Sequence, residues 1–139
     1  DYLCEEIGEK LRKRRLLCGT VAITIKDENL NIIQRQKPQA PPTDITKEIS
    51  ATAFNILSDV WSDGKPIRMI TVAAANLIRR ENASEQISFF DAKININREK
   101  SEKRDNAIDK IRQKYGDTSI VNGAIIDSDI GIYNKKQRD

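Results

Sequence analysis

A run of alternating apolar and polar residues constrains the fold of this chain more than any other feature of its sequence. The run covers residues 20–26, and its large apolar members are Val21, Ile23 and Ile25. A period of two is typical of a strand with one buried and one open face. Turn-forming residues follow at 27–29, and residues 30–37 return as a second strand. The chain is therefore predicted to contain an antiparallel hairpin.

Two segments on either side of this hairpin carry apolar residues at helical spacing. The first has Leu3, Ile7 and Leu11 at intervals of four and is predicted to end near residues 18–19. The second is predicted to start at a cap, Asp44 or Thr46, and to end before residues 63–64. Its buried stripe is Ile45, Ile49, Ala53, Ile56 and Val60. Both segments indicate amphipathic helices with one face against a core.

The segments that border the second helix complete the first domain. Three of the five residues 38–42 are proline, which has no backbone donor, so we predict a loop there. Residues 66–75 are mostly apolar and predict a third strand. The fold class is therefore α+β, a small and mostly antiparallel sheet with two helices on one face.

The remainder of the chain is predicted to be an extension of this domain. The composition turns polar at residue 79, which places the domain at residues 1–78 and a linker at 79–101. Residues 102–139 form a tail whose helix, over residues 102–114, is expected to end at Gly116. Residues 118–126 are short and apolar, which is typical of a strand or a docking segment.

The composition excludes several kinds of catalytic site. The chain has no His, which excludes Ser-His-Asp and Cys-His catalysis and zinc sites that contain His. The two cysteines, Cys4 and Cys18, are too few for a four-thiolate metal site and indicate a reducing compartment. No apolar run approaches the ~20 residues that cross a bilayer, so we expect a cytoplasmic protein with no membrane contact.

The excess positive charge lies in the first part of the chain. Residues 1–80 hold 13 Lys or Arg against 10 Asp or Glu, whereas the rest holds 11 of each. Five of the cations lie within residues 10–15, at the end of the first predicted helix, where the helix dipole favours positive charge. The run is therefore either a solvated helix end or a phosphate-binding patch. The outward positions of the predicted hairpin are Thr20, Thr24, Lys26, Arg35 and Lys37.

Five segments taken together form a recognisable pattern. They are the arginine-rich helix at residues 9–14, the strand at 19–25, the strand end at Arg35, the helix start at 42–44 and, above all, Pro66-Ile67-Arg68-Met69-Ile70-Thr71-Val72-Ala73-Ala74-Ala75-Asn76-Leu77. In this order they resemble the little-finger domain of Y-family translesion DNA polymerases. Residues 108–120 are similar to the C-terminal extension of the bacterial members.

The resemblance implies a domain that binds DNA. The family's little finger is β-α-β-β-α-β, and this chain starts at the first helix, so we expect three of its four strands. The sheet face and the basic end of the first helix would contact the backbone of template-primer duplex DNA. The candidates are Arg14, Arg15, Thr20, Thr24, Arg35, Lys37 and Arg68, each with a solvated surface residue as the alternative.

The resemblance also implies that catalysis lies outside this chain. The family holds two metal ions on carboxylates of its palm, which precedes the little finger. We therefore expect no catalytic residue, metal, cofactor or small-molecule substrate here, whereas the parent polymerase would use Mg²⁺. Asp127 and Asp129 form a lone pair of carboxylates that we expect to be solvated. This chain is interpreted as a C-terminal, non-enzymatic part of a polymerase.

A second motif lies in the predicted linker. Gln86-Ile87-Ser88-Phe89-Phe90-Asp91 is similar to the peptide by which bacterial polymerases bind the sliding clamp, in which Gln and Ser or Asp precede two apolar residues. The resemblance implies that Gln86 and Ser88 belong to the polar part of the motif, while Phe89 and Phe90 fill an apolar pocket of the clamp. The alternative is that the two aromatic side chains anchor the tail on the core.

Two hypotheses for the function follow. The first is a DNA-binding and clamp-tethering part of a Y-family polymerase in DNA damage tolerance and repair. The second is a protein-interaction module of a repair protein that does not bind DNA, and salt-dependent affinity for duplex DNA distinguishes the two. The third strand is expected to have an open edge, covered by a partner chain or by residues 118–126.

Overall fold

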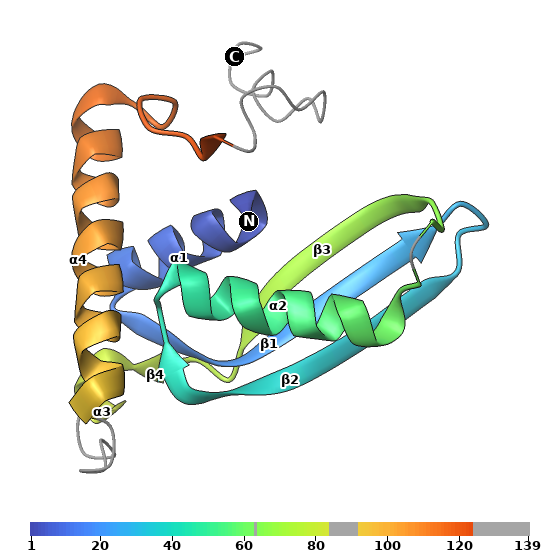
Figure 1. Ribbon diagram of the computed structural model, residues 1–139, viewed down its shortest axis with the longest axis horizontal. Coiled ribbons are helices and arrows are strands. Elements are labelled where there is room, and N and C mark those ends of the chain that lie inside the picture. The colour runs from blue at the N-terminus through green and yellow to red at the C-terminus, as the bar shows by residue number, and fades with distance from the viewer. Residues whose placement is uncertain (63, 84–91, 124–139) are drawn as a thin grey trace.

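The computed structural model describes residues 1–62, 64–83 and 92–123 (Figure 1). Four helices and four strands make up this part of the chain. In chain order they are α1 (Tyr2–Arg14), β1 (Leu16–Asp27), β2 (Ile32–Thr43), α2 (Thr46–Val60), β3 (Ile67–Ala75), β4 (Ile78–Arg79), α3 (Arg80–Ala83) and α4 (Ala92–Tyr115). None of the helices in these residues is long and apolar enough to cross a membrane.

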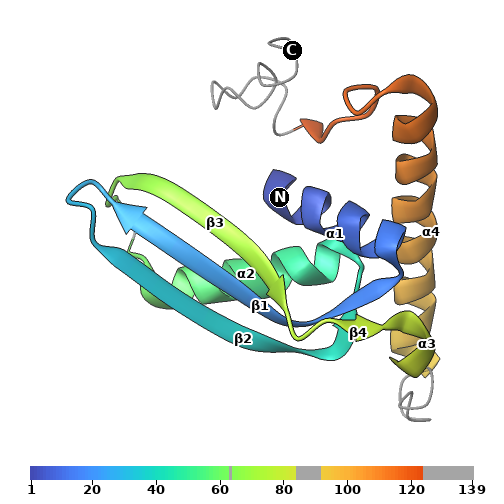
Figure 2. The same ribbon diagram turned by 180° about the vertical axis from the view of Figure 1, so that it is seen from behind.

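The strands form one open antiparallel sheet in the order β2-β1-β3, so β1 is the central strand. The two-residue strand β4 pairs with the start of β1 and adds a fourth strand to the three predicted ones. Helix α1 packs on β1 and β3, and α2 packs on β1 and β2. Figure 2 views the sheet from its other side, where α2 lies behind the strands. The predicted α+β class is confirmed.

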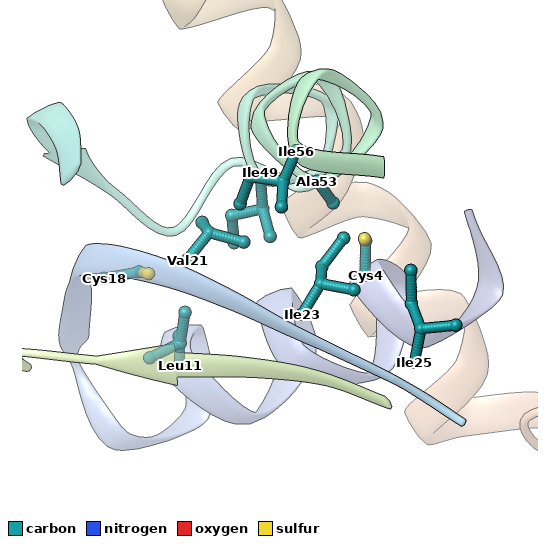
Figure 3. Close-up of a cluster of buried hydrophobic side chains, with 9 residues drawn as sticks. All are labelled: Cys4, Leu11, Cys18, Val21, Ile23, Ile25, Ile49, Ala53 and Ile56. Carbon is teal, nitrogen blue, oxygen red and sulfur yellow. The ribbon is translucent and has the colours of Figure 1, made fainter. Parts of the chain in front are cut away.

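The core lies between β1 and the two helices. Its side chains come from α1, β1 and α2 and are Cys4, Leu11, Cys18, Val21, Ile23, Ile25, Ile49, Ala53 and Ile56 (Figure 3). The three alternating residues of β1 are almost fully buried. Full burial of such a side chain contributes about 1.5–3 kcal/mol. The alternation therefore selects which face of the sheet the helices cover.

Helix α1 ends earlier than predicted, because Arg15 turns the chain. Arg15 has a positive φ of 55°, and its backbone N–H donates to the carbonyl oxygens of Leu11 and Arg12. Such a left-handed residue is a common helix end. Leu16 and Leu17 then pair with β4 instead of continuing the helix.

The prolines of residues 38–42 do not form the predicted loop, because β2 continues through them to Thr43. Strand β2 pairs on one side with β1 and lies at the edge of the described sheet. An edge strand tolerates proline, since a residue there need not donate to a neighbour. The ladder is irregular between the partners of Cys18 and Thr20, at the proline-rich end.

Neither predicted residue caps α2. Its N-cap position is Ile45, which has no side-chain cap, and the preceding turn is closed by Ile45 N–H donating to Thr43 Oγ1 at 3.0 Å. The helix ends at Val60, since Trp61 is extended.

Helix α4 starts at Ala92, within the predicted linker, and stands where α1 ends and α2 begins (Figures 1 and 2). Gly116 ends it with a φ of 99°, as predicted. Residues 118–123 contain no strand and lie near α1 and α4, where the Ile120 carbonyl accepts hydrogen bonds from Arg112. They do not cover β3, whose outer edge is unpaired among the described residues. Residues 124–126 lie outside those residues.

Candidate nucleic-acid interface

The sheet face opposite the helices is open and nearly uncharged. Strand register places on it the even-numbered residues of β1 from Thr20 to Lys26 and the residues opposite them on β2 and β3. These are Thr20, Ala22, Thr24, Lys26, Ile32, Gln34, Gln36, Pro38, Met69, Thr71, Ala73 and Ala75. Lys26 is the single charged residue among these paired positions. The positions at its centre include the small residues Ala22 and Ala73.

Two predicted DNA contacts lie on this open face, but only one of them is accessible. Thr24 is half-buried and stands opposite Thr71. Thr20 is 6% exposed, and its hydroxyl oxygen accepts a 2.8 Å hydrogen bond from Asn76 Nδ2. Thr20 therefore holds the β3–β4 connection in place and does not face solvent.

Arg35 and Lys37 lie on the opposite side of the sheet from the one predicted. They stand across from Ile23 and Val21, whose side chains face the helices. Lys37 forms an ion pair with Asp59 of α2, and Arg35 Nη1 donates to the Gln34 carbonyl at 2.8 Å.

The pairing register explains where these two side chains lie. Residues 28–31 join the two strands, and Leu30 among them adopts a φ of 67°. The register pairs odd-numbered residues of β2 with odd-numbered residues of β1, so Arg35 and Lys37 share the side of Ile23 and Val21, and a shift of one residue would reverse the sides.

The remaining predicted contacts lie at opposite ends of the sheet. Arg68 is exposed near the start of β3, beside the irregular pairing of Lys26 and Asp27. Arg14 and Arg15 are exposed at the junction of α1 and β1. The structure therefore does not bring all seven predicted residues together.

Strand β4 creates a cluster of cations that sequence reasoning missed. It places Arg79 opposite Leu16, and the Arg15 carbonyl accepts a hydrogen bond from the Arg80 N–H at 3.0 Å. Arg14, Arg15 and Arg79 are all exposed, and none has an ion-pair partner among the described residues. We call these three residues the basic corner. In the sequence, the signal that could have revealed this cluster is the adjacent pair of arginines at residues 79–80.

Arg12, at the centre of the basic run, is unavailable to an outside anion. Its side chain is 9% exposed, and its guanidinium contacts Asp105 at 3.3 Å and Asp109 at 2.5 Å. Burial would lower the pKa of Arg12, but the hydrogen bond and charge of Asp109, with the charge of Asp105, raise it above its usual value. Arg12 is therefore a cation of the protein interior.

Several predicted features lie outside the described residues. They are the candidate clamp peptide with Gln86, Ser88, Phe89 and Phe90, and the pair Asp127 and Asp129. Among residues that are described, no three Cys, Asp or Glu side chains gather where they could hold a metal ion.

Known proteins resemble this chain over most of its length. Residues 1–89 match the impB/mucB/samB family C-terminal domain. The chain is 34% identical over 124 residues to a DNA polymerase IV of Acetivibrio thermocellus, a match that covers 89% of this chain and 30% of that protein. It is 35% identical over 121 residues to a DNA polymerase IV 2 of Halalkalibacterium halodurans, covering 85% and 28%. The chain thus spans about 30% of the relatives' length. It belongs to the impB/mucB/samB family and is a C-terminal domain of the kind found in Y-family DNA polymerases.

Proposed function

We propose that this chain is the DNA-binding, non-catalytic part of a Y-family DNA polymerase that acts in DNA damage tolerance. Its family membership and the names of its relatives support a polymerase as the parent protein. In this proposal the Mg²⁺-dependent nucleotidyl transfer belongs to residues outside these 139, and this chain holds the template-primer duplex.

The observation that carries the proposal is the basic corner beside an open sheet face. Three exposed arginines without ion-pair partners among the described residues lie at the start of the central strand. Guanidinium groups bind phosphate oxygens in a bidentate manner. The adjoining face offers threonine and glutamine side chains, which suit phosphate and sugar contacts that do not read sequence.

A carboxylate introduced on the open face tests where DNA binds. Thr24→Glu and Thr71→Glu place a negative charge at the centre of that face, where phosphate repulsion should weaken duplex binding about tenfold. Ser58→Glu is the matched control, because this exposed residue of α2 lies on the helical side and the net charge changes equally. Fluorescence anisotropy with a labelled 20-base-pair duplex gives the three affinities. Equal losses in all three variants would place the interface elsewhere.

We further propose that residues 86–90 bind the bacterial sliding clamp. The motif's polar Gln86 and apolar Phe89 and Phe90 support this assignment. Alanine at these three positions should abolish binding to a purified clamp and leave the melting temperature of the chain nearly unchanged. A large drop in melting temperature would instead support aromatic residues that anchor the tail.

The second candidate function is a clamp-binding module without DNA contact. It requires that neither the basic corner nor the open face bind DNA. Duplex affinity that is absent even at low salt, together with clamp binding, would favour it over the proposal above.

A further inference from the structure

Helix α4 contacts the rest of the domain without contributing to the hydrophobic core. No buried apolar side chain among the described residues comes from α4. Three of its apolar residues, Ile96, Ile111 and Tyr115, are 59%, 37% and 67% exposed, and Ile108 is half-buried. A cavity of about 560 Å³ remains between α1, α2 and α4, and Phe54 on its wall is 54% exposed. Apolar packing therefore contributes little to the position of α4.

Ion pairs make the connection instead. Five of them join α4 to α1, α2 and α3, with N···O distances from 2.5 to 3.3 Å. We call these five pairs the ionic latch, and they are Arg12–Asp105, Arg12–Asp109, Arg80–Glu102, Arg98–Glu48 and Arg112–Glu5. The latch spans α4 from Arg98 to Arg112, so it holds the helix along most of its length.

Asp105 is the central residue of the latch. Its side chain is 4% exposed. Among the described residues of α4, Asp105 is the one that is buried. One carboxylate oxygen, Oδ2, accepts hydrogen bonds from Arg12 Nη1 at 3.3 Å and from the Thr46 backbone N–H at 2.9 Å. Helix α2 has no cap from its own N-cap residue, so Asp105 supplies from α4 an acceptor for its first turn.

The two kinds of contact respond differently to salt. The Debye length falls from about 10 Å at 0.1 M salt to about 3 Å at 1 M, which screens the exposed pair Arg80–Glu102 more than the buried pair Arg12–Asp105. Burial of apolar surface is not screened in this way. The sheet and its two helices share an apolar core, whereas α4 does not.

We propose that α4 is an arm that the ionic latch holds and that ionic strength releases while α1, α2 and the sheet remain folded. Asp105 is the residue that positions the docked arm. In the released state α4 is joined to the domain through the chain that precedes Ala92, and the first turn of α2 loses its acceptor.

Amide hydrogen exchange followed by NMR on the 139-residue chain tests the proposal. The reporter is the Thr46 N–H, because it donates directly to Asp105, and the reference is Ile23 N–H in the central strand. Between about 0.05 M and 1 M NaCl, Thr46 exchange should accelerate about tenfold, while Ile23 exchange changes less than about twofold. Unchanged Thr46 exchange, or equal acceleration at both amides, would overturn the proposal.

A pair of variants assigns the effect to Asp105. Asp105→Asn should accelerate Thr46 exchange at low salt and remove most of its further response to salt. Glu99→Gln removes one carboxylate from an exposed position of the same helix and should leave both rates as in the wild type. If the two variants behave alike, general charge rather than the latch controls the arm. The wild-type salt titration remains decisive even if Asp105→Asn does not fold.

Discussion

Gly8→Ala is expected to destabilise the protein, although alanine is normally the better residue within a helix. Gly8 is buried in α1. A Cβ atom there would lie 2.6 Å from Thr46 Oγ1, 2.8 Å from Arg12 Nη1 and 3.3 Å from the Asp44 carbonyl oxygen. The guanidinium cannot retreat freely, because it donates to that carbonyl at 2.8 Å and to Asp109.

The expected magnitude follows from two opposing contributions. Helix propensity favours alanine over glycine by about 1 kcal/mol, while overpacking a tight site costs about 1–3 kcal/mol. The contact with Arg12 and with a backbone carbonyl places the cost toward the upper end, so we expect a net loss of about 1–2 kcal/mol. For a chain of this size the melting temperature should fall by roughly 3–6 °C.

Urea unfolding followed by circular dichroism measures this difference. Asn55→Ala, at an exposed position of α2, is the control, and it should stabilise the chain by about 0.5 kcal/mol through helix propensity alone. If Gly8→Ala is more stable than the wild type by a similar or larger amount, the close approach of α1 to the start of α2 is wrong.

Two further predictions concern the hairpin and the core. The Asn31 side chain and the backbone N–H groups of Asn29 and Asn31 donate hydrogen bonds to the Asp27 carboxylate, and these bonds lower the pKa of Asp27. The ionised Asp27 therefore stabilises the fold fully above its unfolded pKa of about 3.9. This stabilisation is lost as the pH falls through the lower pKa of the folded state. Asp27→Asn should remove this part of the dependence of the free energy of unfolding on pH. Denaturation curves between about pH 5 and pH 2 measure that dependence, and a variant with the same slope as the wild type would contradict the prediction. Ile49→Ala, at a side chain 1% exposed, should lower the free energy of unfolding by about 2–5 kcal/mol, whereas Phe54→Ala, 54% exposed on the same helix, should lower it far less; similar losses would show that the assignment of the buried face is wrong.

Local patterns in the sequence predicted the central elements well. The alternation of Val21, Ile23 and Ile25 and the helical stripe with Ile49 and Ile56 report the same buried layer from two sides. Each pattern arises from one element and the single face that it buries, so it is visible without knowledge of the rest of the fold.

The predictions that failed concern features that the local pattern of apolar residues does not show. Residues of α4 that lie 93 and 97 positions away bury Arg12, so the basic run could not reveal that one of its cations is internal. The side of the sheet that Arg35 occupies depends on the pairing register of β2 with β1, and a shift of one residue would reverse it.

The salt dependence of duplex DNA binding tests the proposed function most directly. The logarithm of the wild-type association constant should fall linearly with the logarithm of the salt concentration. Arg14→Gln, Arg15→Gln and Arg79→Gln together should reduce the slope by about 2.7, because each phosphate that an arginine neutralises adds ~0.9 to it. The matched control replaces three exposed lysines of α4, Lys100, Lys103 and Lys110, with Gln and should leave the slope nearly unchanged. A triple arginine variant with the wild-type slope, or a control whose slope falls equally, would contradict a DNA interface at the basic corner.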